Sequence, residues 1–201
     1  IHLDEPAIGV MNRIGLEFSA VGNHEFDQGW QELLRKQNGG CHKWTSRTPC
    51  AVGRFTGARF RYLAASTRSA NGSTLFPATG IKTFGQGRNK VRVGFVGLTL
   101  KGTANLVSPG GITGLTFADE AATINAAVPQ LKRQGADAVV VLIHQGGATD
   151  GIPDPQGCNN LTGDILPIMR QLNPGVDVVV SGHTHRSYIC DYGTIDPSRP
   201  I

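Results

Sequence analysis

Four of the six histidines in this chain come directly after apolar segments that read as strands. The segments, with the polar residues that follow them, are 16–21 with Asn23 and His24, 137–143 with His144, and 178–180 with His183 and His185. Loops at the carboxyl ends of strands are where ligands bind in α/β sheets. We therefore expect these side chains to face one cavity.

These residue types are suited to binding metal ions. Neutral imidazole is a good ligand for Zn, Mn, Fe and related divalent ions, and the amide oxygen of an asparagine can complete the shell. A hydrolytic two-metal site holds its ions about 3.5–4 Å apart, activates a water and clamps a phosphoryl group. The pair His183 and His185 alone is a weak indication, because two polar loop residues would give the same pattern.

Charge argues against a complete two-metal site. Two divalent ions held by neutral ligands would leave about four positive charges unbalanced, and such sites normally include carboxylates, one of which bridges the ions. No Asp or Glu in the chain directly follows an apolar strand as the histidines do. Either the carboxylates come from elsewhere, or this is not a two-metal site.

The apolar pattern predicts strands that alternate with helices, plus one hairpin. We expect helices over 5–12, 27–37, 117–134 and 161–172, and strands over 16–21, 59–65, 80–85, 90–98, 137–143, 178–180 and 187–192. Asp27 is a plausible N-cap for the second helix. The valine run 178–180 suits a strand buried on both faces. This order predicts a mixed-sheet α/β sandwich.

Length and composition are those of one globular domain over 1–201. Hydrophobic residues make up 39% and charged residues 17%, which excludes a disordered chain. No apolar run approaches the roughly 20 residues that cross a bilayer, so no membrane span is expected. The net charge of +4 is scattered. Without a basic helix or an aromatic-interleaved patch, we expect no nucleic-acid partner.

The four cysteines favour two disulfides, although four cysteines allow three pairings and the sequence does not choose among them. Cys41 and Cys50 bracket a short polar loop, while Cys158 and Cys190 lie near segments that could meet. We favour these two pairs, and with them an oxidising compartment, periplasmic or secreted. The alternative is four buried free thiols in a cytosolic protein.

Three sequence blocks resemble the calcineurin-like metallophosphoesterases. They are GNHEFD at 22–27, IHQGG at 143–147 and GHTH at 182–185. The first block is similar to the 5'-nucleotidase branch in particular. The resemblance runs through most of the chain and implies the αββα sandwich of that family.

The resemblance also implies roles for individual residues. The second metal would be bound by Asn23, His144 and His183, and the first by His185. His24 would approach the phosphoryl oxygen and the leaving group, with Asp27 as its acidic partner. An imidazolium held by a carboxylate can stabilise charge that develops on the leaving oxygen.

The chain departs from the family pattern at both ends. The family opens with Asp-x-His and Gly-Asp blocks, which supply the remaining ligands and the bridging Asp, and neither occurs before Gly22. The family's C-terminal nucleotide-binding domain is absent as well. We therefore expect a sandwich that is incomplete at its N-terminus, with 197–201 as the start of a linker. A missing N-terminal segment would supply the other ligands, and this chain alone would retain metal weakly and have negligible activity.

The function implied by the resemblance is that of a secreted or periplasmic phosphohydrolase with two divalent ions (Zn, Mn, Fe or similar). Its partner would be a small-molecule phosphoester, first of all a 5'-nucleotide. Hydrolysis of cyclic nucleotides, nucleotide sugars or thiosulfonates stays open. A non-catalytic binding or structural module on the same fold is the alternative from another class.

Overall fold

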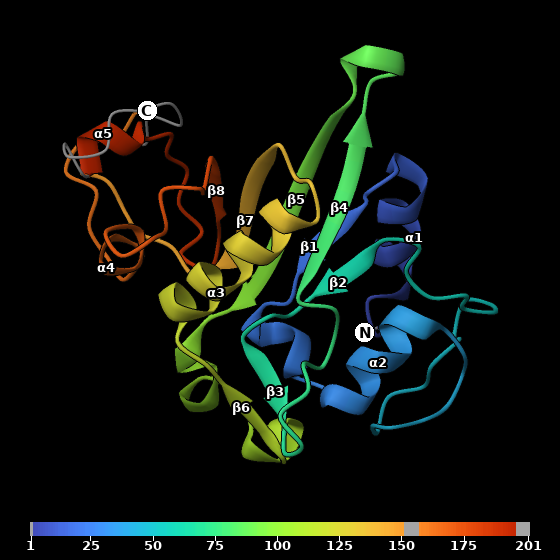
Figure 1. The fold of residues 1–201 in the computed structure, drawn as a ribbon. Helices are drawn as coiled ribbons and strands as arrows, with labels where there is room; N and C mark the ends of the chain where they lie inside the picture. The colour runs from blue at the N-terminus through green and yellow to red at the C-terminus, as the bar shows by residue number, and fades with distance from the viewer. Residues whose placement is uncertain (1, 151–156, 196–201) are drawn as a thin grey trace.

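The computed structural model describes residues 2–150 and 157–195, and its largest sheet has four strands (Figure 1). In spatial order they are β4 (Thr79–Phe84), β5 (Val91–Thr99), β7 (Ala138–His144) and β8 (Val178–Ser181). β4 and β5 form the expected antiparallel hairpin, whereas β5, β7 and β8 run parallel. Parallel strands end at the same edge, so the loops that follow them emerge side by side.

A second, smaller sheet packs against the first. It pairs β1 (Phe18–Ala20) in parallel with β2 (Arg61–Leu63), and it lies against β5 and β7. The two sheets come so close that a Cβ on Gly97 would lie 2.4 Å from the Cβ of Leu63. Such a separation is too short for two carbon atoms, so glycine is required where the sheets meet.

Helices cover the outer faces of both sheets, which gives the expected αββα layering (Figure 1). The helices are α1 (Glu5–Ile14), α2 (Trp30–Asn38), α3 (Glu120–Arg133), α4 (Ile165–Met169) and α5 (Tyr192–Ile195). One buried cluster joins α1 and α2 to the β1–β2 side and includes Ile8, Phe26 and Leu33. The other packs α3 and α4 on β5 and β7. The sequence prediction of a mixed α/β sandwich is confirmed.

Short elements complete the described part of the chain. They are an antiparallel pair of strands, β3 (Thr67–Ser69) with β6 (Leu115–Phe117), and the 3-10 turns η1 (Asn23–Phe26), η2 (Gly87–Asn89), η3 (Lys101–Asn105) and η4 (Pro109–Ile112). Asp119 caps α3 by accepting the N–H of Ala122 at 3.1 Å. None of the helices in the described residues has the length and hydropathy needed to span a bilayer.

Buried charges join α1 to α2. The guanidinium of Arg35 lies 2.8 Å from a carboxylate oxygen of Glu5 and 2.7 Å from one of Glu32, and all three side chains are almost fully buried. Burial by itself lowers the pKa of Arg35, but its bonds to Glu32 and Glu5 outweigh that effect and raise it. These ion pairs hold α1 against α2, the helix that follows the 3-10 turn η1.

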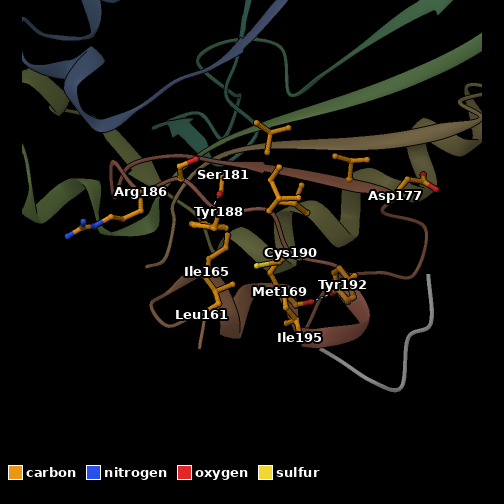
Figure 2. A pocket seen from close by; sticks show the side chains of 15 residues that line it. Leu161, Ile165, Met169, Asp177, Ser181, Arg186, Tyr188, Cys190, Tyr192 and Ile195 are labelled. Carbon is orange, nitrogen blue, oxygen red and sulfur yellow. Dashed lines mark hydrogen bonds between the residues drawn. The ribbon is translucent and has the colours of Figure 1, made fainter. Parts of the chain in front are cut away.

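The prediction that 178–180 is buried on both faces is wrong. Val178 is 50% exposed and Val180 is 52% exposed. The reason is that the β1–β2 sheet lies on β5 and β7, and β8 is an edge strand beyond that cover. β8 borders a pocket of about 480 Å³ whose walls include the apolar side chains of Leu161, Ile165 and Met169 (Figure 2).

Three local predictions also need correction. Asp27 does not cap α2, because η1 runs to Phe26 and Gly29 occupies the N-cap position. The helix expected over 161–172 is only five residues long, since Thr162 instead pairs with Ala148 in an isolated bridge. The strand expected over 187–192 does not form, and Tyr188 is anchored to Ser181 by a 2.6 Å hydroxyl contact.

Both favoured disulfides are confirmed. Cys41 is bonded to Cys50 and Cys158 to Cys190. The second disulfide ties the segment after β8 to the loop that leads into α4. The linker expected at 197–201 lies outside the described residues.

Candidate functional site

The site begins with two side chains from different sheets. β1 is followed by η1, whose first residue, Asn23, is only 3% exposed. Its amide oxygen lies 2.9 Å from Nε2 of His144, the last residue of β7. The two residues are 121 positions apart in the sequence, so the sandwich itself brings them together.

The loop after β8 brings His183 to the same place. The imidazole rings of His144 and His183 lie edge to face, with centroids 5.1 Å apart. Two hydrogen bonds join the loops after β7 and β8: Gly182 N–H donates to the Gln145 carbonyl at 3.3 Å, and Thr184 Oγ1 donates to the Gly147 carbonyl at 2.7 Å. The distance between the two histidines is therefore set by contacts between their loops.

The backbone around the His-x-His pair is unusual. His183 has φ 71° and His185 has φ 55°, which is the left-handed region that residues other than glycine seldom occupy. Such conformations cost of order 1–3 kcal/mol each and gather at functional sites. His185 is exposed, and its charge is among those that lower the pKa of His144.

Gly22 and Glu25, for which no role was predicted from the sequence, complete this part of the site. Gly22 N–H donates to Oε2 of Glu25 at 2.6 Å. A Cβ on Gly22 would lie 2.7 Å from that oxygen and 2.8 Å from Cε1 of His144. The signal for Glu25 was its position three residues after Gly22 at the start of a helical turn, the spacing of a capping box.

Electrostatics keep His144 neutral near pH 7. Burial lowers the pKa of His144 to about 4, and charge repulsion from His183, His24 and His185 adds to the shift. A neutral imidazole has a lone pair available for a cation. The same surroundings that disfavour a proton on His144 therefore leave it ready to bind a metal ion.

His24 and Asp27 form an exposed pair on the turn η1. Nδ1 of His24 lies 2.9 Å from Oδ2 of Asp27, and the side chains are 72% and 49% exposed. An ion pair this exposed contributes little to stability. The contact fixes the orientation of the ring, because Nδ1 faces the carboxylate.

A model of the calcineurin-like phosphoesterase family matches residues 9–187 of this chain. The chain belongs to the calcineurin-like phosphoesterase family. The matched range contains every residue of the candidate site.

Relatives of this phosphoesterase have several names. The protein described as endonuclease YhcR of Bacillus subtilis (strain 168) is 33% identical over 184 residues, which is 91% of this chain and 14% of that protein. A 5'-nucleotidase of Vibrio cholerae is 27% identical over 183 residues, which is 90% of this chain and 28% of that protein. The crystal structure of a 5'-nucleotidase precursor from Thermus thermophilus matches with a TM-score of 0.65 and 27% identity, over 90% of this chain and 29% of that one. The chain thus spans less than a third of the length of these relatives.

Phosphoesterases of this family generally use divalent metals, and the donors in this chain can be tested for fit. The amide oxygen of Asn23 and the imidazoles of His144 and His183 are ligand types that suit one divalent ion. Within residues 2–150 and 157–195, no three His, Cys, Asp or Glu side chains gather closely enough to hold a metal by themselves. The donor types therefore fit a divalent ion, and the carboxylate of Glu25 lies on the same side of Gly22 as the ring of His144.

Proposed function

We propose that this phosphoesterase chain belongs to a metal-dependent hydrolase that removes the phosphate from 5'-nucleotides. The observation that carries the proposal is the meeting of Asn23, His144 and His183 beside the exposed pair of His24 and Asp27. This arrangement combines neutral metal ligands with a proton donor, which phosphoester cleavage requires.

The metal ligands would be Asn23, His144 and His183 for one ion and His185 for another. Bound there, divalent ions would supply Lewis acidity to the phosphoryl oxygens. The low pKa of His144 keeps its nitrogen unprotonated for this purpose at neutral pH. The contacts between the loops after β7 and β8 hold the ligands in place without substrate.

His24 would act on the substrate itself. Asp27 holds the His24 ring through Nδ1, and we propose that the N–H at Nε2 faces the substrate. That N–H can donate to the phosphoryl oxygen and to the alcohol oxygen as the bond to phosphorus breaks. Asp27 acts by holding the ring in place, and it does not need to touch the substrate.

Two further observations support the proposed substrate class and the proposed compartment. The names of the Vibrio and Thermus relatives point to 5'-nucleotides. The two disulfides are what an oxidising compartment, periplasmic or extracellular, would produce. The name of the Bacillus relative makes nucleic-acid phosphodiesters the rival substrate class, and a non-catalytic module is the rival function.

The test measures hydrolysis by the protein expressed from its complete gene. Phosphate release from AMP and p-nitrophenyl phosphate is compared with cleavage of single-stranded DNA, each with added Mn²⁺ or Zn²⁺. We expect His24→Ala to lower kcat on AMP by about 10²–10⁴-fold, the usual contribution of a general acid. His42→Ala is the matched control, because His42 is exposed and stacks on Trp44 in the loop closed by Cys41–Cys50.

The rivals give different results. Preferred cleavage of DNA over AMP would favour the nuclease. Metal binding without turnover of any of these substrates would favour the non-catalytic module. Near-native turnover in His24→Ala would show that the role given to His24 is wrong.

A further inference from the structure

The loop after β7 is held at one residue, Gly147, by two side chains from the segment after β8. The N–H of Gly147 donates to the hydroxyl of Tyr188 at 3.1 Å, and its carbonyl accepts Oγ1 of Thr184 at 2.7 Å. Gly147 follows His144 by three positions, and Thr184 lies between the two histidines of the other loop. Both polar groups of this glycine are therefore bound by side chains next to candidate metal ligands.

Tyr188 makes a second contact that closes the histidine loop. Its hydroxyl lies 2.6 Å from Oγ of Ser181, the last residue of β8 (Figure 2). The Tyr188 oxygen accepts the Gly147 N–H, and a hydroxyl can accept and donate at once, so its own proton can be shared with Ser181. The segment 182–187 lies between these two residues. The contact therefore ties together the two ends of the segment that carries His183 and His185.

The two loops approach each other closely because glycines occupy positions 146 and 147. A Cβ on Gly146 would lie 2.2 Å from the carbonyl oxygen of Gly182, and a Cβ on Gly147 would lie 2.3 Å from the carbonyl oxygen of Thr162. Carbon and oxygen atoms that are not bonded do not come this close. The absence of side chains at both positions therefore allows the backbone of this loop to come within hydrogen-bonding distance of the segment after β8.

The histidine loop needs such contacts because its backbone is strained. His183 and His185 both have a positive φ, 71° and 55°. Residues other than glycine keep this conformation only where the surrounding structure imposes it. Thr184 lies between the two strained residues and Tyr188 follows them, so their hydrogen bonds constrain the loop from within and from its end. Removing these hydrogen bonds would allow the loop to relax.

We propose that Thr184 and Tyr188 are positioning residues for the metal site. Through their hydrogen bonds to Gly147 they hold His183 beside His144 at a separation that allows both rings to bind one divalent ion. Neither hydroxyl binds the ion itself. The inference rests on the metal ligands named in the proposed function, and it does not depend on which phosphoester is the substrate.

The first measurement is made without metal, on the protein expressed from its complete gene and treated with EDTA. Hydrogen exchange is followed by mass spectrometry in peptides that cover 143–148 and 181–188. We expect faster exchange in Thr184→Val and in Tyr188→Phe, because each variant loses a hydroxyl that holds the two loops together. Urea unfolding of the same samples verifies that both variants are folded.

The second measurement is the affinity for Mn²⁺, titrated into the metal-free protein after EDTA is removed. We expect binding to be roughly 10–100-fold weaker in Thr184→Val and Tyr188→Phe, the usual effect of losing a residue that orients a metal ligand. Thr184→Ser keeps the hydroxyl and should bind Mn²⁺ as the wild type does. The control is Thr116→Val, which makes the same change at an exposed position of β6 and should also match the wild type.

The outcomes separate this inference from the proposed function. Wild-type Mn²⁺ affinity in both Thr184→Val and Tyr188→Phe would overturn the positioning role even if AMP is hydrolysed, and so would a Thr184→Ser variant that binds as weakly as Thr184→Val. Reduced unfolding free energy with unchanged Mn²⁺ affinity would show that the hydroxyls only stabilise the fold. Weakened Mn²⁺ binding in the variants of a protein that hydrolyses no phosphomonoester would support the positioning role and overturn the proposed function.

Discussion

Lowering the pH should destabilise the metal-free protein through His144. The ordinary pKa of His144 is 6.5, and in the fold it is lowered to about 4. Between these values the unfolded state binds more protons than the folded state. Stability is therefore fully present above about pH 6.5 and is lost as the pH falls toward 4.

The size of this loss follows from the shift. A pKa difference of one unit corresponds to about 1.4 kcal/mol, so the full effect of His144 is at most about 3 kcal/mol. At pH 5 most of it is already lost, which leaves an expected difference of about 2 kcal/mol between pH 7.5 and pH 5. His144 is partly solvent-accessible, and screening makes this an upper value.

The assay is urea unfolding in EDTA, at pH 7.5 and at pH 5, for the wild type, His144→Gln and His42→Gln. The compared quantity is the change in unfolding free energy between the two pH values, which cancels the effect of each substitution at neutral pH. We expect His144→Gln to show a smaller loss by about 2 kcal/mol, and His42→Gln to follow the wild type. Equal pH dependence in His144→Gln and wild type would refute the burial argument for this histidine.

Further predictions concern stability and metal content. Glu32→Gln should destabilise the protein by about 3–5 kcal/mol in urea unfolding, because it leaves the buried Arg35 incompletely paired; an effect below about 1 kcal/mol would contradict the buried cluster. Gly22→Ala should cost about 1–3 kcal/mol, since the new methyl group would lie 2.7 Å from Oε2 of Glu25 and 2.8 Å from Cε1 of His144. Val141→Ala in β7 should cost more than Val180→Ala in β8, by about 1–2 kcal/mol, because Val141 is fully buried and Val180 is half exposed. Mass spectrometry of this purified chain should find fewer than two tightly bound metal ions per molecule, and two would show that the available ligands suffice.

Much of the fold was readable because its signals are local. The valine-rich run in β7 and the turn between β4 and β5 have the length and composition of strands and a hairpin, and both formed as predicted. The two disulfides joined the pairs that loop length and position favoured. The pairing of His24 with Asp27 was also local, since three residues of one helical turn place them side by side.

Other features depend on which elements pack against one another in the folded chain. The valines of β8 look like those of a central strand, yet the β1–β2 sheet does not extend over them and they remain half exposed. Asp27 is of a residue type that often caps helices, but the preceding 3-10 turn shifts the start of α2 to Trp30.

The sequence by itself determined which residues could do chemistry and the family to which they belong. The types of the ligand residues and their positions after strands can both be recognised in short stretches of sequence. Only the tertiary structure decided that Asn23 contacts His144 across 121 positions and that the rings of His144 and His183 lie edge to face. These facts depend on the packing of the two sheets and on the contacts between their loops. Such long-range contacts have no signature in the spacing of residues along one chain.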